Sequence, residues 1–190
     1  MSAWELPTSL QVGSSELKIR TDFRVILDIL TYFNDPEYEI DEQWEICLRI
    51  LFTDEVFEDF SSDEIQEAMR QAIWFIDMGM EEDGKNKHRV MDWQQDAKII
   101  IPSVNRVMGK EIRALEYLHW WTFLGAYMEI GESLFSQILS IRMKKAKGKK
   151  LDDWEQEFYR ENKELVRLQE RYTEDEKKEK EELLRMLEGK

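Results

Sequence analysis

The segment Leu118-His119-Trp120-Trp121-Thr122-Phe123-Leu124 decides the fold class of this chain. It lies within a helical pattern that runs from Tyr117 to Ile130, in which polar or small residues recur only every three or four positions. A helix that is apolar nearly all round must be buried nearly all round. In a chain of 190 residues, this requires either a central place in the core or a partner protein.

Length and composition favour one helical protein with a real core. Hydrophobic residues make up 42% and charged residues 36% of the chain, and only three prolines and eight glycines interrupt it. The single cysteine, Cys47, excludes an internal disulfide and is typical of a reducing compartment. The sequence shows no signal-peptide pattern and no apolar stretch long enough to cross a bilayer. We therefore expect a cytoplasmic protein that does not bind membranes.

The net charge of −14 is unevenly distributed along the chain. Between Asn34 and Glu67 there are 13 acidic residues and a single basic one, Arg49. Binding to the phosphates of nucleic acids requires clustered Lys and Arg, so this acidic part argues against a nucleic-acid partner. The one basic cluster, Arg142 to Lys150, is interpreted as a solvated linker.

The patterns along the chain predict a mainly α fold that begins with a small β-hairpin. Leu10 to Val12 and Leu17 to Ile19 alternate apolar and polar residues around a Gly-Ser turn, which is typical of a hairpin. Cap residues and three-four spacing then predict several helices. The first helix starts at Thr21 or Asp22, the second runs from about Asp41 to Phe52, and the third from Ser61 or Ser62 to Gly79. The fourth runs from Asp92 to Val107 and has a kink or break at Pro102. A further helix follows the aromatic helix and runs from Ser133 to about Met143.

Apolar rows indicate which helix faces are buried. The second helix is expected to bury Trp44, Leu48 and Leu51. The third is expected to bury a row of five residues at helical spacing: Ile65, Met69, Ala72, Ile73 and Ile76.

The predicted domain organisation has three parts. Residues 1–143 form a compact helical core domain with the hairpin, residues 144–150 a basic linker, and residues 151–190 carboxy-terminal amphipathic helices that form a charged tail. Thr173 and Glu176 make a capping box for the last helix. Two apolar sets lie in this part, namely Leu151, Trp154, Phe158, Leu165, Leu168 and Tyr172, followed by Leu183, Leu184 and Leu187.

Residues with catalytic or metal-binding chemistry form no recognisable group. His88 and His119 lie in different elements without zinc spacing, and Cys47 has no second thiol nearby. No glycine-rich loop could cradle a phosphate. The acids from Asp35 to Asp41 lack the glycine and the closing glutamate of a calcium loop. We expect no enzyme activity, no metal and no cofactor.

The aromatic helix leaves two interpretations open. Trp120, Trp121 and Phe123 fit a core, yet Trp and Tyr are also favoured anchors of protein interfaces. Partner contacts could also come from the leucines of the last helix. The candidate partner-binding residues are therefore Tyr117, Trp120, Phe123, Tyr127, Leu183, Leu184 and Leu187.

A series of short blocks resembles the phage gene-product-fifteen family of siphophages and prophages of Gram-positive bacteria. The resemblance covers roughly residues 6 to 170, and two of its blocks are specific, namely Thr21-Asp22-Phe23-Arg24 and His119-Trp120-Trp121-Thr122-Phe123. The blocks in order are Leu6-Pro7, Ile19-Arg20-Thr21-Asp22-Phe23-Arg24, Asp92-Trp93, Asp96-Ala97, Leu118-His119-Trp120-Trp121-Thr122-Phe123 and Ile138 to Arg142. The chain departs from the family at Ile99-Ile100-Ile101-Pro102 and at Gly109-Lys110-Glu111-Ile112, where members carry an aromatic and alanine-rich segment and a Gly-Ile-Asp-like turn.

The resemblance implies a tail assembly chaperone that has no catalytic residue. Such a protein is expected to bind the long, helical tape measure protein and keep it soluble in the host cytoplasm, and to be absent from the mature virion. The major tail tube protein and a second copy of the chain are further candidate partners. Two alternatives stay open: a structural component of the tail or connector, and an acidic DNA mimic that inhibits a host nucleic-acid-binding enzyme.

Overall fold

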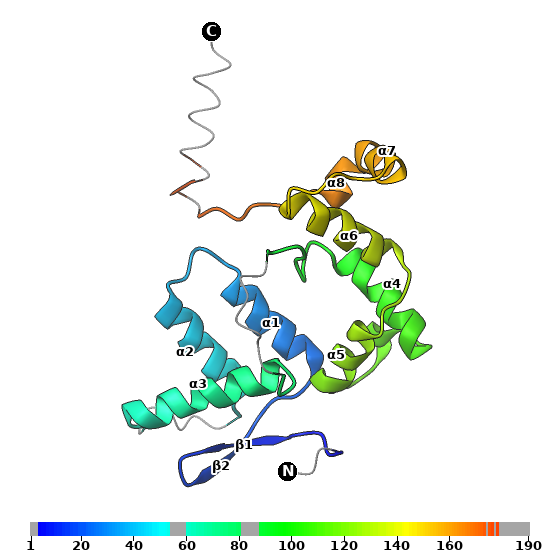
Figure 1. The fold of residues 1–190 in the computed structure, drawn as a ribbon. Coiled ribbons are helices and arrows are strands. Elements are labelled where there is room, and N and C mark those ends of the chain that lie inside the picture. The colour runs from blue at the N-terminus through cyan, green and yellow to red at the C-terminus, as the bar shows by residue number, and fades with distance from the viewer. Residues whose placement is uncertain (1–3, 54–59, 81–87, 174, 177, 179–190) are drawn as a thin grey trace.

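The protein is a mainly helical molecule with an amino-terminal antiparallel hairpin, which confirms the predicted fold class (Figure 1). The computed structural model describes residues 4–53, 60–80, 88–173, 175, 176 and 178. Its elements are β1 (Ser9–Val12), β2 (Ser15–Lys18), α1 (Phe23–Phe33), α2 (Ile40–Leu51), α3 (Ser62–Ile76), α4 (Ala97–Met108), the short 3-10 helix η2 (Ile112–Ala114), α5 (Trp120–Met128), α6 (Leu134–Ala146), α7 (Asp153–Glu161) and α8 (Lys163–Val166).

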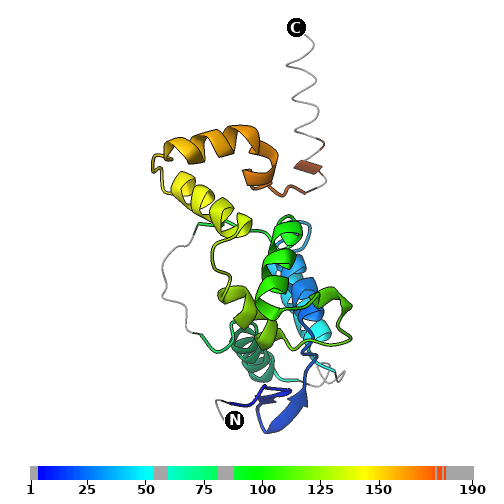
Figure 2. The same cartoon turned by 90° about the vertical axis from the view of Figure 1, so that its right-hand side faces the viewer.

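The helices pack in two linked groups between the hairpin at one end and α7 with α8 at the other (Figures 1 and 2). In the first group, α2 packs against both α1 and α3, and α3 also contacts β1 of the hairpin. In the second group, α4 packs against α5 and α6, and α6 contacts α8. Contacts between α1 and α5 join the two groups, so the aromatic helix lies at the junction.

The hairpin forms where the alternating pattern predicts it. Val12 pairs with Ser15, so that Gly13 and Ser14 make the turn. Gly13 has a φ of +56°, which an L side chain rarely adopts and glycine adopts without strain. Leu10 and Leu17 point into the core, and the hairpin therefore covers the end of the helical body.

Cap residues set the start of most helices, as the sequence predicts. The Asp22 side chain accepts the Arg24 N–H at 3.0 Å and starts α1. Ser61 and Glu64 form a capping box at the start of α3. α4 differs from the prediction, because its cap is Asp96 and the preceding residues form a turn. Of the predicted kink or break at Pro102, the break is wrong, since α4 continues through this residue as one helix.

The aromatic helix is shorter than predicted and begins at Trp120. Leu118 and His119 are extended, because they pair with the segment before α1 instead of joining the helix. The Trp120 N–H donates to Thr21 O at 2.7 Å, and the Phe23 N–H donates to Leu118 O at 2.9 Å. Hydrogen bonds to a distant segment thus override the local helical pattern.

The buried face of α3 lies beside the one that the apolar spacing predicts. Ala68, Ala72 and Phe75 are fully buried, whereas Ile73 is 45% exposed. The prediction is therefore confirmed for Ala72 and wrong for Ile73, and Ile65, Met69 and Ile76 are only partly buried. In α2, by contrast, Leu48 and Leu51 are buried and Trp44 is half-buried.

The carboxy-terminal part continues directly from α6. This helix extends to Ala146, so the first residues of the predicted linker are helical. The Thr173–Glu176 capping box forms as predicted, with the Thr173 N–H 2.8 Å from the Glu176 carboxylate. The three leucines predicted for the last helix, Leu183, Leu184 and Leu187, lie outside the described residues.

Candidate functional site

The two specific sequence blocks form one joint at the centre of the fold. Asp22 and His119 make an antiparallel bridge, and the Asp22 carboxylate also accepts the Leu118 N–H at 3.0 Å. The Arg24 guanidinium binds this carboxylate at 3.1 Å and donates to Leu115 O at 2.7 Å. These bonds join residues nearly one hundred positions apart in the sequence. The two blocks therefore have a structural role: they hold the fold together.

Trp120 and Phe123 belong to this core. Only 1% of Trp120 and 2% of Phe123 are exposed. The Phe123 ring stacks on Phe23 at 4.7 Å and on Trp120 at 5.6 Å. The Trp120 indole N–H donates to Ile76 O at 2.8 Å, which binds α5 to the end of α3. The expectation that these two residues contact a partner is corrected, because neither presents a surface in this fold.

The two predicted tyrosines have different environments. Tyr117 is 54% exposed, and its hydroxyl lies 2.6 Å from Thr21 Oγ1. Tyr127 is half-buried beside Trp93, and burial together with the Asp96 charge raises its pKa to about 12. Of the predicted partner-binding residues that the structure describes, Tyr117 alone is largely open to a partner.

His119 has a structural role. Its Nδ1 accepts the Trp121 N–H at 3.0 Å and caps α5, which leaves the proton on Nε2 to be donated to Pro7 O at 2.9 Å. Burial lowers the pKa of His119 and favours the neutral ring. With both ring nitrogens engaged, His119 holds the amino-terminal segment against the aromatic helix.

Cys47 is likewise part of the core. Burial raises the pKa of its thiol to about 12, so the reactive thiolate does not form at neutral pH. Within the described ranges, no three His, Cys, Asp or Glu side chains are grouped so that they could hold a metal ion. None of the described helices is long and apolar enough to cross a bilayer.

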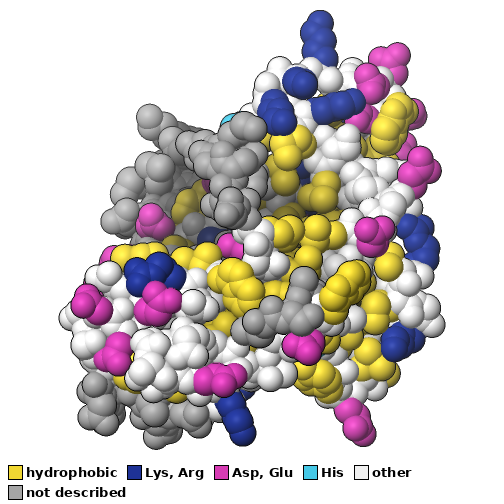
Figure 3. Space-filling model, turned by 60° about the horizontal axis from the view of Figure 1, so that its bottom comes forward, with side chains coloured by type: hydrophobic (Ala, Val, Ile, Leu, Met, Phe, Trp, Pro, Cys, Tyr) yellow, Lys and Arg dark blue, Asp and Glu magenta, His cyan; other side chains and the backbone are white. Residues whose placement is uncertain are grey.

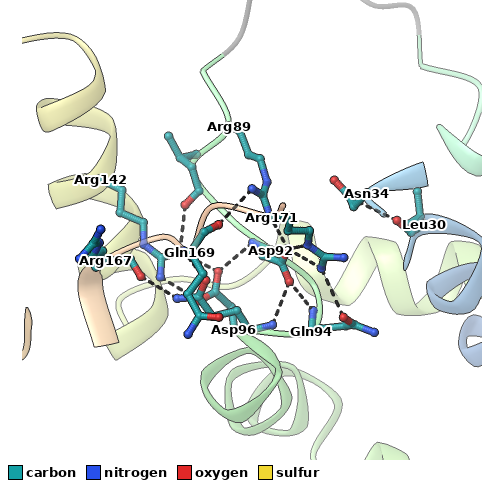
Figure 4. A network of polar contacts seen from close by, with 12 residues as sticks. Leu30, Asn34, Arg89, Asp92, Gln94, Asp96, Arg142, Arg167, Gln169 and Arg171 are labelled. Atoms are coloured by element: carbon teal, nitrogen blue, oxygen red, sulfur yellow. Dashed lines mark hydrogen bonds and ion pairs between the residues drawn. The ribbon is translucent and has the colours of Figure 1, made fainter. Parts of the chain in front are cut away.

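A buried ion pair between α4 and α6 is the strongest polar feature that sequence patterns did not reveal (Figure 4). Arg142 Nη1 and Nη2 lie 2.6 and 2.9 Å from the two carboxylate oxygens of Asp96. Both side chains are at least 95% buried. The remaining N–H groups of Arg142 donate to the carbonyl oxygens of Val166, Val90 and Leu165 at 2.7, 3.1 and 3.0 Å. All five donors of the guanidinium are therefore used.

Asp92, beside this pair, fastens the segment that follows α8 (Figure 4). Arg171 and Arg89 both donate to Oδ2 of its carboxylate, at 2.7 and 2.5 Å. Burial would raise the pKa of Asp92, but hydrogen bonds from the Gln95 N–H and Arg171 outweigh it and lower the pKa. The Gln95 amide adds two bonds to backbone atoms of residues 167 and 169. The chain after α8 is thus pinned along the turn before α4.

An apolar groove between α2 and α3 is the second feature that sequence analysis missed. It has a volume of about 370 Å³ and is lined by residues of both helices. Leu48 forms part of its floor, while Trp44 and Met69 are half-buried. The apolar rows of both helices are visible in the sequence through their helical spacing, but spacing alone predicts that both rows belong wholly to the core. We call this feature the α2–α3 groove; its lining residues are Asp41, Trp44, Glu45, Leu48, Arg49, Ile65 and Met69.

Fold and site together define a mainly helical protein with an amino-terminal hairpin, an aromatic joint at its centre and an open apolar groove on its acidic part. The family described as "Bacteriophage Gp15 protein" matches residues 4–172 of the chain. The chain therefore belongs to this family, which confirms the resemblance seen in the sequence and identifies a phage protein of the structural or assembly-related kind. A search of curated proteins found no match, and a search of solved structures found none.

Proposed function

We propose that this chain is a tail assembly chaperone that binds the tape measure protein and keeps it soluble until the tail forms. The observation that carries the proposal is membership of a phage family together with apolar surface left open beside acid-rich helices. The protein would act in the host cytoplasm and leave before the virion is complete. The major tail tube protein and a second copy of the chain are proposed as further partners.

The surface of the protein fits the needs of a chaperone for a long helical client. Apolar side chains of the client have to be covered by apolar side chains of the chaperone, and such surfaces mark interaction sites when they are contiguous. Figure 3 shows hydrophobic side chains gathered across the centre of one face of the molecule. Large apolar side chains that stay open include Leu6, Ile40, Ile73, Trp74, Met80, Tyr117 and Met128.

The charge of the protein supports the same function. A net charge of −14 keeps a complex with an aggregation-prone client in solution through mutual repulsion, and it disfavours binding to DNA. This function does not require that any covalent bond be formed or broken. Nothing in the placement of His119 or Cys47 favours an enzyme, because one is engaged at both nitrogens and the other is a buried thiol.

Co-expression with the tape measure protein of the same phage tests the proposal. We expect the tape measure protein to move from the insoluble to the soluble fraction and to co-purify with this chain. Mass spectrometry of purified virions should find the tape measure protein without this chain. A fixed copy number of the chain in virions would support the structural-component alternative, and absence of both rescue and co-purification would rule out the chaperone.

A further inference from the structure

We propose that the α2–α3 groove binds an amphipathic α-helix whose apolar stripe is flanked by basic side chains. The inference rests on the proposed function, because it takes the helical client of the chaperone as the helix that binds in this groove. The groove is independent of the aromatic joint, which is closed by its own packing.

The shape of the groove suits a helix. α2 supplies Trp44 and Leu48 one turn apart, and α3 supplies Ile65 and Met69 with the same spacing. Side chains four positions apart lie on the same face of a helix, so the two helices form the walls of a trough. An apolar helix laid into such a trough can insert residues at i, i+3, i+4 and i+7.

The apolar rows extend beyond the groove in both helices. Ile40 lies one turn before Trp44 and is 60% exposed, and Ile73 lies one turn after Met69. Neither side chain fills the core, since other residues do so in each helix: Cys47, Leu48 and Leu51 in α2, and Ala68, Ala72 and Phe75 in α3. Each row of large apolar side chains therefore continues from the α2–α3 groove onto the exposed surface. A partner can contact this larger apolar area as well as the groove itself.

The charged residues around the α2–α3 groove indicate which kind of partner helix it binds. Asp41 and Glu45 stand on the rim, and Arg49 is held by Glu45 through a 2.9 Å bond from Nε to Oε1. The charged residues that line the groove are thus two carboxylates and one guanidinium, in a chain with a net charge of −14. This balance favours a cationic partner and disfavours a second copy of this acidic chain.

A peptide-binding experiment with the full chain tests the inference. The probe is a labelled helical peptide of about 18 residues, roughly 27 Å long at 1.5 Å per residue, so that it covers the whole length of the 12-residue α2, roughly 18 Å. It carries leucines at i, i+3, i+4 and i+7 and lysines on both flanks. The comparison peptide has glutamate in place of every lysine. Fluorescence anisotropy should show binding of the lysine peptide and at least about tenfold weaker binding of the glutamate peptide.

Three variants locate the site. Met69→Lys places a charge in the trough and should weaken the lysine peptide at least about tenfold, while the flexible lysine stem lets the fold persist. Asp41→Lys, on the rim, should weaken it about three- to tenfold and strengthen the glutamate peptide. The matched control is Val107→Lys on α4, where the side chain is 40% exposed outside the groove. It should change binding less than about twofold.

Several results would overturn the inference. Equal binding of both peptides removes the charge argument, and unchanged binding by Met69→Lys and Asp41→Lys removes the site. If Met69→Lys does not fold, Asp41→Lys at the rim decides alone. A dimer in sedimentation experiments that Met69→Lys dissolves would assign the groove to a second copy. Because the assay contains no phage client, a failure here leaves the co-expression result to decide the proposed function separately.

Discussion

Replacing Arg142 by methionine removes the cation from the buried pair with Asp96 and leaves the carboxylate without its partner. Breaking a buried ion pair in this way costs about 3–5 kcal/mol. The three carbonyl oxygens of Val90, Leu165 and Val166 lose their donors as well. If they stayed dry, each would add about 1–3 kcal/mol.

The protein has a less costly response, which limits the expected loss. α8 and the following segment reach the body through Arg142, Asp92 and Gln95, so they can open to water while the rest stays folded. We therefore expect Arg142→Met to lower the free energy of unfolding by about 3–5 kcal/mol. For a protein of this size that is a fall in Tm of about 6–20 °C.

Urea unfolding followed by circular dichroism measures the loss, and hydrogen exchange locates it. Exchange should rise first at residues 163–172. Adding Asp96→Asn to Arg142→Met removes the unpaired charge and should recover part of the stability. Arg106→Met is the control, because that guanidinium binds Glu132 O at the surface and should cost below about 1 kcal/mol. An Arg142→Met loss no larger than the control, with unchanged exchange, would refute the reasoning.

Three further outcomes follow from the same structure. Trp120→Ala should lower the free energy of unfolding by about 3–5 kcal/mol in urea, since the ring is fully buried; a stable variant that lost only client binding would reverse its assignment to the core. The pKa of His119 is lowered in the folded state, so the unfolded state takes up the proton first; its contribution to stability is present above about pH 6.5 and is lost as the pH falls below it. Urea midpoints of the wild type and of His119→Gln should therefore converge on acidification, and a constant difference contradicts this. With a thiol pKa of about 12, alkylation of Cys47 at pH 8 should track unfolding in urea, whereas rapid labelling of the native protein would disprove its burial.

Local chemistry made much of the fold predictable. The Gly13 turn, the Asp22 and Ser61 caps and the Thr173 capping box depend on neighbours within a few positions, and all appear where the sequence places them. The sequence pattern places the start of α5 too early, because Leu118 pairs with a segment far away in the sequence and no local pattern reports this pairing.

The polar and open features were harder to predict for a physical reason. Arg142 opens a run of basic residues and looks like the start of a solvated linker, yet the fold carries it to Asp96. Similarly, helical spacing shows that Met69 and Ile73 share a face but not whether another element covers it. Only the packing of the folded chain shows whether an apolar helix face is buried in the core or open to a partner. For this reason the predicted partner-binding residues do not include those that line the α2–α3 groove.

Suppression of client aggregation is the direct test of whether this protein is a chaperone of the tape measure protein. A tape measure fragment is diluted from denaturant, and light scattering is recorded with no addition, with the wild-type chain, with Met69→Lys and with Val107→Lys. We expect the wild type and Val107→Lys to keep scattering low at equimolar amounts, and Met69→Lys to fail to do so. Scattering that rises equally with and without the wild-type chain would contradict the claim that this protein is a chaperone of the tape measure protein.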